Sequence, residues 1–228
     1  MTGLKLKNTS RRVLAALFDM DGVLVDSISL HMESWNEVFT NMGLPPFTHE
    51  EYFSVLGHTN KDMLSAYSKY NHVRFSSYQI KNILTRKEVV FREKIMHQSS
   101  TTPGVDDWLT FFIQNHIFCS VASSANMVNI VFILHTLKIS EYFSSVISGT
   151  YFPAGKPDPC IFLSAAASLG ISAKDCLVIE DAPAGIQAAK SANMICCAIA
   201  TSFPKNELAE ADIVLESLDE INPDMLFE

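Results

Sequence analysis

The chain has 228 residues, a length that suits one large domain or one domain carrying an insertion. Hydrophobic residues make up 48% of the sequence and charged residues 18%, which excludes a disordered chain and leaves ample material for a buried core. With 17 basic and 25 acidic residues, the formal net charge of −8 argues against nucleic acid or an anionic membrane as a partner.

The N-terminal segment is basic and then apolar, as the start of a signal peptide is. Its apolar run, residues 13–18, is shorter than the apolar region of a signal peptide and leads directly into Asp19 and Asp21. No run approaches the roughly 20 apolar residues that span a bilayer. The five cysteines form no C-x-x-C pair and mostly lie in apolar runs, which is typical of buried free thiols in a reducing compartment. We therefore expect a cytoplasmic protein with no membrane contact.

Residues 13–18 also begin a series of short apolar runs that predict strands buried on both faces. The later runs of this kind lie at residues 117–122, 145–148, 176–179, 195–200 and 212–215. Segments that read as helices lie between them, at residues 104–115, 126–137, 159–169 and 182–192. Strands that alternate with helices predict an α/β fold with a doubly wound parallel sheet, a Rossmann-like core.

The interval between the first and second predicted strands departs from this alternation. It reads as helices only, at residues 29–42, 60–70 and 77–97. We therefore expect an α/β core made of residues 1–27 and 101–228, and a helical cap domain, residues 28–100, inserted after the first strand.

Charged and hydroxyl side chains follow four of the predicted strands or precede the next helix. They are Asp19 and Asp21, Ser123 and Ser124, Lys156, and the pair Glu180 and Asp181. Each signal alone is typical of a turn or a helix cap. Together they indicate one ligand site, because ligands of open α/β sheets bind at the carboxyl ends of the strands.

Four carboxylates gathered at one sheet edge repel one another unless a cation lies between them. Oxygen ligands without histidine or cysteine favour a hard ion, which in this setting indicates Mg²⁺. A lysine and a hydroxyl directed at the same point suit a phosphate group. The combination predicts phosphoryl transfer.

The segments Asp19-Met20-Asp21-Gly22-Val23-Leu24-Val25-Asp26-Ser27, Ser123, Gly155-Lys156-Pro157-Asp158-Pro159 and Glu180-Asp181-Ala182-Pro183-Ala184-Gly185 resemble the motifs of the haloacid dehalogenase superfamily. The closest resemblance is to its β-phosphoglucomutase-like and sugar-phosphate phosphatase branch. All four motifs occur in the family's order, and the resemblance covers nearly the whole chain, including the helical insertion.

This resemblance implies a role for each motif residue. Asp19 would attack phosphorus and become an aspartyl phosphate, and Asp21 would act as general acid and then general base. Mg²⁺ would be held by the carboxylates of Asp19 and Asp181 and the backbone carbonyl of Asp21, with Glu180 binding directly or through water. The phosphoryl oxygens would be held by Ser123, Ser124 and Lys156. A carboxylate at Asp21 favours phosphate chemistry over dehalogenation, because a departing halide needs no proton.

The cap residues point to hydrolysis rather than mutation. His31 matches a histidine that mutase-like members place near the active site, but it reads equally well as a partly buried helix histidine. The mutase has a lysine before the glycine that matches Gly57 and an arginine three residues after it. Here those places hold Leu56 and Asn60, so the cations that would hold the second phosphate of a bisphosphate are missing.

The leading hypothesis is a Mg²⁺-dependent phosphatase that acts, as a monomer, on a small phosphate ester such as a sugar or polyol phosphate. One alternative is a sugar-phosphate mutase of the β-phosphoglucomutase type. An alternative of another class is a phospho-accepting regulatory module, although such modules are short and carry no helical insertion.

Overall fold

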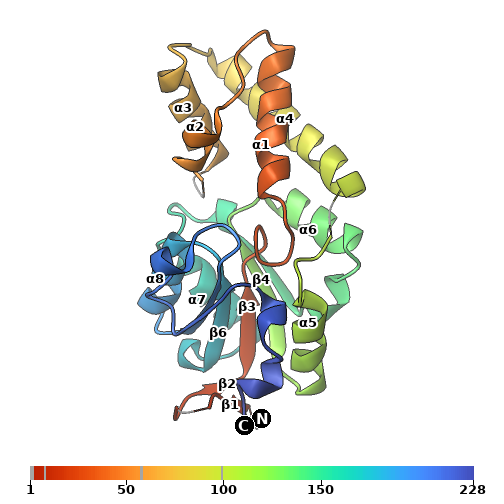
Figure 1. The fold of residues 1–228 in the computed structure, drawn as a ribbon, viewed down its shortest axis with the longest axis vertical. Helices are drawn as coiled ribbons and strands as arrows, with labels where there is room; N and C mark the ends of the chain where they lie inside the picture. The colour runs from red at the N-terminus through yellow and green to blue at the C-terminus, as the bar shows by residue number, and fades with distance from the viewer. Residues whose placement is uncertain (1–2, 8, 57–58, 99) are drawn as a thin grey trace. The chain divides into compact units, whose positions relative to one another are not determined.

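The computed structural model describes residues 3–7, 9–56, 59–98 and 100–228. The chain divides into two compact units (Figure 1). The first, here called the sheet unit, is made of Met1–Asp26 and Ser100–Glu228, and the second, the helical unit, is Ser27–Ser99.

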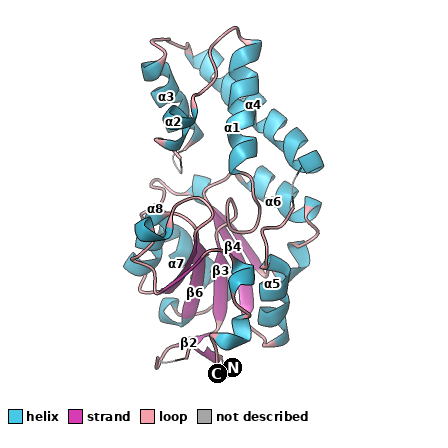
Figure 2. Ribbon diagram, viewed as in Figure 1, coloured by secondary structure: helices cyan, strands magenta, loops and turns pink. Residues whose placement is uncertain are grey.

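The sheet unit is built on six parallel strands in the order β5-β4-β3-β6-β7-β8 (Figure 2). They are β3 (Ala15–Phe18), β4 (Phe118–Ser123), β5 (Ser145–Ser148), β6 (Cys176–Glu180), β7 (Ile195–Ile199) and β8 (Ile213–Leu215). Each corresponds to a predicted strand. In the register, Phe18 pairs with Val121 on one side and Ile179 on the other, so residues 19, 122 and 180 lie level with one another at the carboxyl ends of neighbouring strands.

Alternate residues of β3 are directed to opposite faces of the sheet, and all of them are buried. Helices therefore cover both faces. Leu17 belongs to an apolar cluster with Phe162 and Ile186 on one face. Phe18 makes an edge-on ring contact with Phe112 on the other, with the ring centroids 6.1 Å apart. The helices of this unit are α5 (Val105–Gln114), α6 (Met127–Thr136), α7 (Cys160–Leu169) and α8 (Pro183–Ser191). The predicted doubly wound α/β fold is confirmed.

Short 3₁₀ helices occupy several connections and the C-terminal segment of the sheet unit. They are η1 (Ser140–Tyr142), η2 (Gly149–Tyr151), η3 (Ala173–Asp175), η4 (Lys205–Glu207), η5 (Leu218–Glu220) and η6 (Pro223–Met225). One of them helps to hold α5, since the buried indole of Trp108 donates a hydrogen bond of 2.8 Å to the Leu218 carbonyl.

The basic N-terminal segment forms a hairpin of β1 (Leu4–Lys5) and β2 (Arg12–Val13), which the sequence analysis did not predict. Residues 13–18 are therefore not one strand, because Val13 belongs to the hairpin and β3 begins at Ala15. Lys5 exchanges backbone hydrogen bonds with Glu228 and forms a 2.7 Å ion pair with it, so the segment is held by the other end of the chain (Figure 1 marks the two ends).

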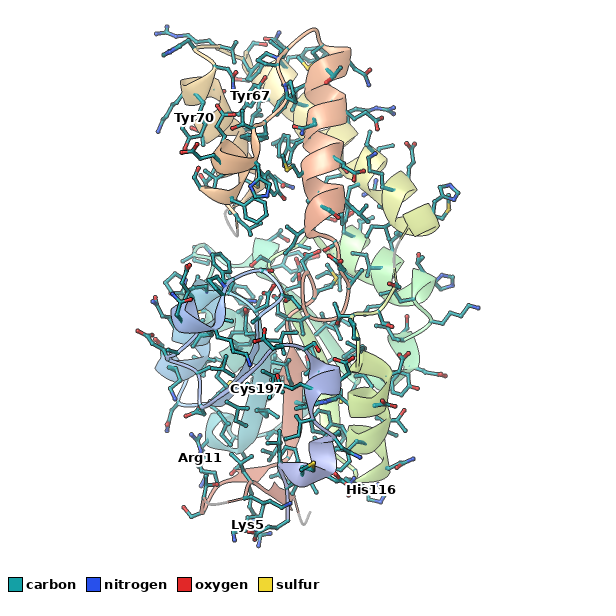
Figure 3. The ribbon with its side chains drawn as sticks, viewed as in Figure 1. Lys5, Arg11, Tyr67, Tyr70, His116 and Cys197 are labelled. Atoms are coloured by element: carbon teal, nitrogen blue, oxygen red, sulfur yellow. The ribbon has the colours of Figure 1, made fainter. Side chains whose placement is uncertain are left out.

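The helical unit consists of α1 (Ile28–Asn41), α2 (His49–Phe53), α3 (Asn60–Tyr70) and α4 (Ser77–Gln98). Its core is rich in aromatic side chains, among them Tyr67 (labelled in Figure 3), on which Phe39 stacks with the ring centroids 3.6 Å apart. Three of the helices were predicted, whereas the five-residue α2 was not; a capping box of Thr48 and Glu51 begins it. Within the part of the chain that the structure describes, no helix is both long and apolar enough to cross a lipid bilayer.

All five cysteines are free thiols, and four of them are buried: Cys119, Cys176, Cys196 and Cys197. Burial raises the pKa of Cys197, which lies in β7, to about 12 (Figure 3). Cys160, at the start of α7, is exposed.

Native protein treated with an aromatic disulfide reagent should therefore react quickly at one thiol and slowly at the other four, because buried thiols are neither accessible nor ionised. Absorbance of the released thiolate gives the count, and denatured protein should react at all five. The Cys160→Ser variant should lose the fast phase; a fast phase of two or more thiols would contradict this packing.

Candidate active site

Asp19 is the first residue after β3 and is 8% exposed. Beyond it the chain turns back sharply, since the backbone amides of Val23, Leu24 and Val25 all donate to the Met20 carbonyl. Gly22 makes this turn with φ +79°, in the left-handed region that favours glycine. A side chain at Gly22 would also overlap the carboxylate of Asp181, so the turn and the second acidic residue are packed directly together.

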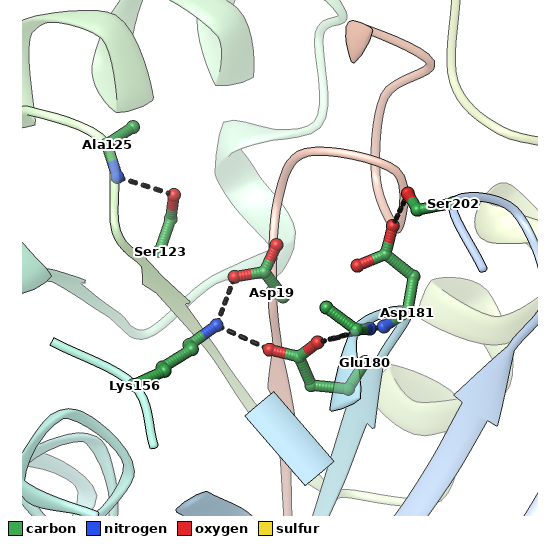
Figure 4. Close-up of polar contacts among 8 residues, drawn as sticks. Asp19, Ser123, Ala125, Lys156, Glu180, Asp181 and Ser202 are labelled. Atoms are coloured by element: carbon green, nitrogen blue, oxygen red, sulfur yellow. Dashed lines mark hydrogen bonds and ion pairs between the residues drawn. The ribbon is translucent and has the colours of Figure 1, made fainter. Parts of the chain in front are cut away.

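Lys156 links the carboxylates of two neighbouring strands (Figure 4). Its Nζ donates to Asp19 Oδ1 and, over 2.5 Å, to Glu180 Oε1. Lys156 and Glu180 are both largely buried, and the ammonium group also lies 4.9 Å from the centre of the Phe162 ring. Because β3 and β6 are adjacent and in register, one lysine can contact both acids.

Glu180 is held at both of its carboxylate oxygens. While Oε1 accepts from Lys156, Oε2 accepts from the backbone amides of Asp181 at 2.9 Å and Ala182 at 3.0 Å (Figure 4). These amides lead into α8, whose N-terminal dipole favours a negative charge. Gly185, on the first turn of α8, leaves the space that the carboxylate fills, because a Cβ there would overlap it.

Asp181, the first residue after β6, is 4% exposed. Its Oδ2 accepts a hydrogen bond from Ser202, which follows β7 (Figure 4). Thr201 contacts both the turn at Gly22 and the residue after β6. Its hydroxyl donates to the Gly22 carbonyl at 2.6 Å and is 3.4 Å from Asp181 Oδ2.

The predicted phosphate-binding serines lie at the carboxyl end of β4, on the side of β3 opposite β6: Ser123 is the last residue of the strand and Ser124 follows it. Ser123 is buried, and its Oγ accepts a hydrogen bond of 3.1 Å from the Ala125 amide (Figure 4). Ser124 is exposed. A hydroxyl that accepts from the backbone still has its own proton to donate, so Ser123 is able to donate to an incoming anion.

The buried carboxylic acids are costly to ionise. Burial raises the pKa of Asp19 from 3.8 to about 7, against the lowering effect of Lys156, and the charges of Glu180 and Asp21 raise it further. Burial and the charges of Glu180 and Asp19 likewise raise the pKa of Asp181 well above its usual value. Burial alone lowers the pKa of Lys156, but Asp19 and Glu180 more than offset this and raise it, so the lysine stays charged.

These groups fit a divalent cation beside Asp19 and Asp181. Their donors are oxygens only, the chemistry that Mg²⁺ prefers. The charge of Asp19 disfavours the ionised form of Asp181, and a cation would remove that penalty. Among the described residues, no three carboxylate, histidine or cysteine side chains are already grouped as a metal site. Glu180 faces Lys156 and the amides instead.

The predicted cap residues lie in the helical unit, apart from Gly57, which lies outside the described residues. His31 is half-buried in α1 and stacks on Phe91 with the ring centroids 3.8 Å apart. Its Nδ1 is 2.8 Å from Nζ of Lys87, a residue only 1% exposed. Asn60 donates to Glu88 Oε1 over 2.6 Å.

Thr201, Ser202 and Lys87 were not among the predicted site residues. A signal for the first two is present in the sequence, since these hydroxyl residues directly follow the predicted strand 195–200. Lys87 stands among other charged residues of a long helix, and nothing in its spacing distinguishes it from a solvent-facing lysine.

The model of the haloacid dehalogenase-like hydrolase family matches residues 16–199. The chain belongs to this family. The stretch that matches contains Asp19, Ser123, Lys156 and the pair Glu180 and Asp181.

Individual relatives lie in the branch that the motifs resemble. The chain is 29% identical over 218 residues to β-phosphoglucomutase of Bacillus subtilis, covering 94% of each protein. It is 27% identical over 222 residues to hexitol phosphatase B of Escherichia coli K12, covering 94% of this chain and 96% of that protein. The crystal structure of CbbY from Rhodobacter sphaeroides, in complex with phosphate, is similar with a TM-score of 0.84 and 26% identity, covering 91% of this chain and 96% of that one.

The predicted superfamily and the predicted kind of enzyme, a hydrolase of the haloacid dehalogenase type, are thus confirmed. Membership in a hydrolase family favours an enzyme over the phospho-accepting regulatory module.

The role of Gly185 as space for Glu180 can be tested by Gly185→Ala. Alanine is intrinsically better than glycine in a helix by about 1 kcal/mol, but here its methyl group would displace a buried carboxylate held by three donors. We expect a net loss of about 1–3 kcal/mol in the free energy of unfolding, measured by urea denaturation.

Gly155→Ala is the matched control, because nothing lies within 4 Å of a Cβ at that glycine and its backbone is not left-handed. Its free energy of unfolding should stay within about 0.5 kcal/mol of the original. Equal effects of the two substitutions would refute the packing argument.

Proposed function

We propose that the protein is a Mg²⁺-dependent phosphatase that hydrolyses a small phosphorylated sugar or polyol through an aspartyl-phosphate intermediate. The observation that carries the proposal is the buried contact of Lys156 with Asp19 and Glu180, next to Asp181. A carboxylate nucleophile and a phosphate ester are both anions, so their approach needs positive charge at the point of attack.

In the first step, a carboxylate oxygen of Asp19 forms a bond to phosphorus while the bond from phosphorus to the substrate oxygen breaks. One oxygen of Asp19 contacts Lys156, and Figure 4 shows the other pointing away from the lysine. Asp21 gives a proton to the departing oxygen, so the product leaves as a neutral alcohol.

In the second step, Asp21 takes a proton from water as the water oxygen bonds to phosphorus and the bond to Asp19 breaks. Inorganic phosphate leaves, and both aspartates return to their starting forms. Asp21 lies two residues beyond Asp19, in the turn that the Met20 carbonyl holds, so it can serve the same reaction.

The carboxylates of Asp19 and Asp181 and the backbone carbonyl of Asp21 would hold Mg²⁺, which supplies charge neutralisation for the phosphoryl oxygens. Glu180, whose oxygens already accept three hydrogen bonds, keeps Lys156 in place beside this site and would reach the ion through water. Lys156 and the hydroxyls of Ser123 and Ser124 would donate to the transferred phosphoryl group.

The substrate class rests on the relatives and on the helical unit, which we propose is a cap that selects substrate. One relative is named a hexitol phosphatase and another a β-phosphoglucomutase, both of which concern phosphorylated carbohydrates. Asn60 offers a neutral amide where the mutase has an arginine, and it is bonded to Glu88. Glu88 in turn lies 3.0 Å from Lys87, so this cation is already compensated. These contacts favour a substrate with one phosphate.

A sugar-phosphate mutase is the second candidate, favoured by the 29% identity to β-phosphoglucomutase over almost the full length of both proteins. A mutase must retain a bisphosphate while it turns over, whereas Leu56 and Asn60 are uncharged. Hydrolysis therefore stays the leading proposal. We also propose that the enzyme acts in the cytoplasm, where its free thiols would remain reduced; a monomeric state stays a prediction from the sequence.

The variant Asp19→Asn should lose phosphate release from an aryl phosphate and from hexitol phosphates by at least about a thousand-fold, because the amide is a poor nucleophile. Its thermal stability should change little, since the neutral amide suits a buried site. Asp106→Asn, which removes an exposed acid at the start of α5, is the control and should keep full activity. Activity of Asp19→Asn close to that of the unaltered enzyme would exclude this nucleophile.

Hydrolysis and mutation can be separated with β-glucose 1-phosphate plus a small amount of glucose bisphosphate in the presence of Mg²⁺. A phosphatase releases inorganic phosphate in step with loss of substrate, and this is the expected result. Both inorganic phosphate and glucose 6-phosphate should be measured. Formation of glucose 6-phosphate without phosphate release would replace the phosphatase proposal with the mutase.

A further inference from the structure

Two hydroxyl side chains after β7 contact the acidic end of the site from a third strand. Ser202 donates to Asp181 Oδ2, and Thr201 donates to the Gly22 carbonyl over 2.6 Å (Figure 4 draws the Ser202 contact). Neither residue belongs to the motifs that define the family resemblance, and neither has a role in the reaction steps above. Their position at the end of β7 makes them part of the same sheet edge.

The two hydroxyls donate to different acceptors, because each has a single proton to donate. Thr201 Oγ1 is 2.6 Å from the Gly22 carbonyl and 3.4 Å from Asp181 Oδ2, so its proton belongs to the carbonyl. The donor to Asp181 is therefore Ser202. One residue holds the turn after Asp19, and its neighbour holds the carboxylate.

Gly22, Asp181 and Ser202 are also in close contact. A Cβ at Gly22 would lie 2.8 Å from Ser202 Oγ and would overlap the Asp181 carboxylate. Asp181 is thus confined by the turn on one side and by a hydroxyl on another, in a nearly closed environment. The terminal torsion of an aspartate is broad when nothing fixes it, so a hydrogen bond to one oxygen determines where the other points.

We propose that Ser202 and Thr201 are positioning residues for the divalent cation of this site. By occupying Oδ2, Ser202 leaves Oδ1 of Asp181 for the cation; by holding the Gly22 carbonyl, Thr201 fixes the turn that carries the Asp21 carbonyl. The inference rests on the proposed function, because it assumes that Asp181 binds Mg²⁺. Hydrogen-bond partners of ligating carboxylates commonly change metal affinity about 10–100-fold when they are removed.

Ser202→Ala and Thr201→Val remove the hydroxyls, and Ser202→Thr and Thr201→Ser keep them. Ser217→Ala is the matched control, because it removes a hydroxyl that contacts an exposed carboxylate, Asp219, which is not a proposed ligand of the cation. Mg²⁺ alone is titrated into each protein by calorimetry, and the rise in melting temperature with Mg²⁺ is recorded. The Mg²⁺ dependence of kcat and of KM for an aryl phosphate is measured in parallel.

We expect Mg²⁺ binding to be at least about tenfold weaker in Ser202→Ala, and weaker to a smaller extent in Thr201→Val. The hydroxyl-keeping variants and Ser217→Ala should bind as the unaltered protein does. At saturating Mg²⁺, kcat should largely recover and KM should be unchanged, which a general loss of stability would not produce.

Unchanged Mg²⁺ affinity in Ser202→Ala, with normal Mg²⁺ binding and phosphatase activity in the unaltered protein, would overturn the positioning role and leave the proposed function intact. Failure of the unaltered protein to bind Mg²⁺ or release phosphate would overturn both. A loss in Ser202→Ala that saturating Mg²⁺ does not restore would also contradict the inference.

Discussion

The structure of the sheet unit depends on one arrangement of charge, an ammonium group held between two buried carboxylates. Lys156 contacts Asp19 at the end of β3 and Glu180 at the end of β6. Without the lysine, two acids would be buried side by side with no compensating charge, which is strongly destabilising. With it, one carboxylate can be presented at the edge of a sheet that is otherwise apolar. The glycine beside Glu180 and the amides of the chain entering α8 complete this arrangement.

Lys156 does not balance all of the negative charge at this edge of the sheet. The charge of Asp19 disfavours the ionised form of Asp181, while Lys156 contacts Asp19 directly. The residual negative charge lies next to the turn at Gly22, where the backbone is held from the neighbouring strand by Thr201. A hard cation suits this place because it would satisfy the charge that the protein leaves unbalanced.

The helical unit also contains a buried lysine whose charge is compensated by neighbouring groups. Its buried Lys87 lies 3.0 Å from Glu88 and 2.8 Å from His31, and the rings of Trp35 and Phe91 are within 6 Å of the ammonium group. A lysine that is 1% exposed needs such partners, because an isolated buried ammonium would give up its proton. The two units thus use the same physical device, a buried lysine beside a carboxylate, in different surroundings.

Local sequence patterns were sufficient for most regular elements: apolar runs predicted the six strands of the parallel sheet, and apolar spacing, capping residues and the alternation with strands predicted every described α-helix except α2. They also located the motif residues, because each lies at or after the end of a strand or, for Lys156, shortly before a helix. The two-residue strands β1 and β2 are too short to show periodicity, and their pairing depends on Glu228 at the far end of the chain. Which oxygen of Glu180 faces Lys156, and which hydroxyl reaches Asp181, depend on side chains from separate strands, and only packing determines them. The sequence by itself determined the fold class and the chemical groups available, whereas the tertiary structure decided which groups touch, since hydrogen bonds act over about 3 Å and only the assembled sheet brings residues so far apart in the chain that close.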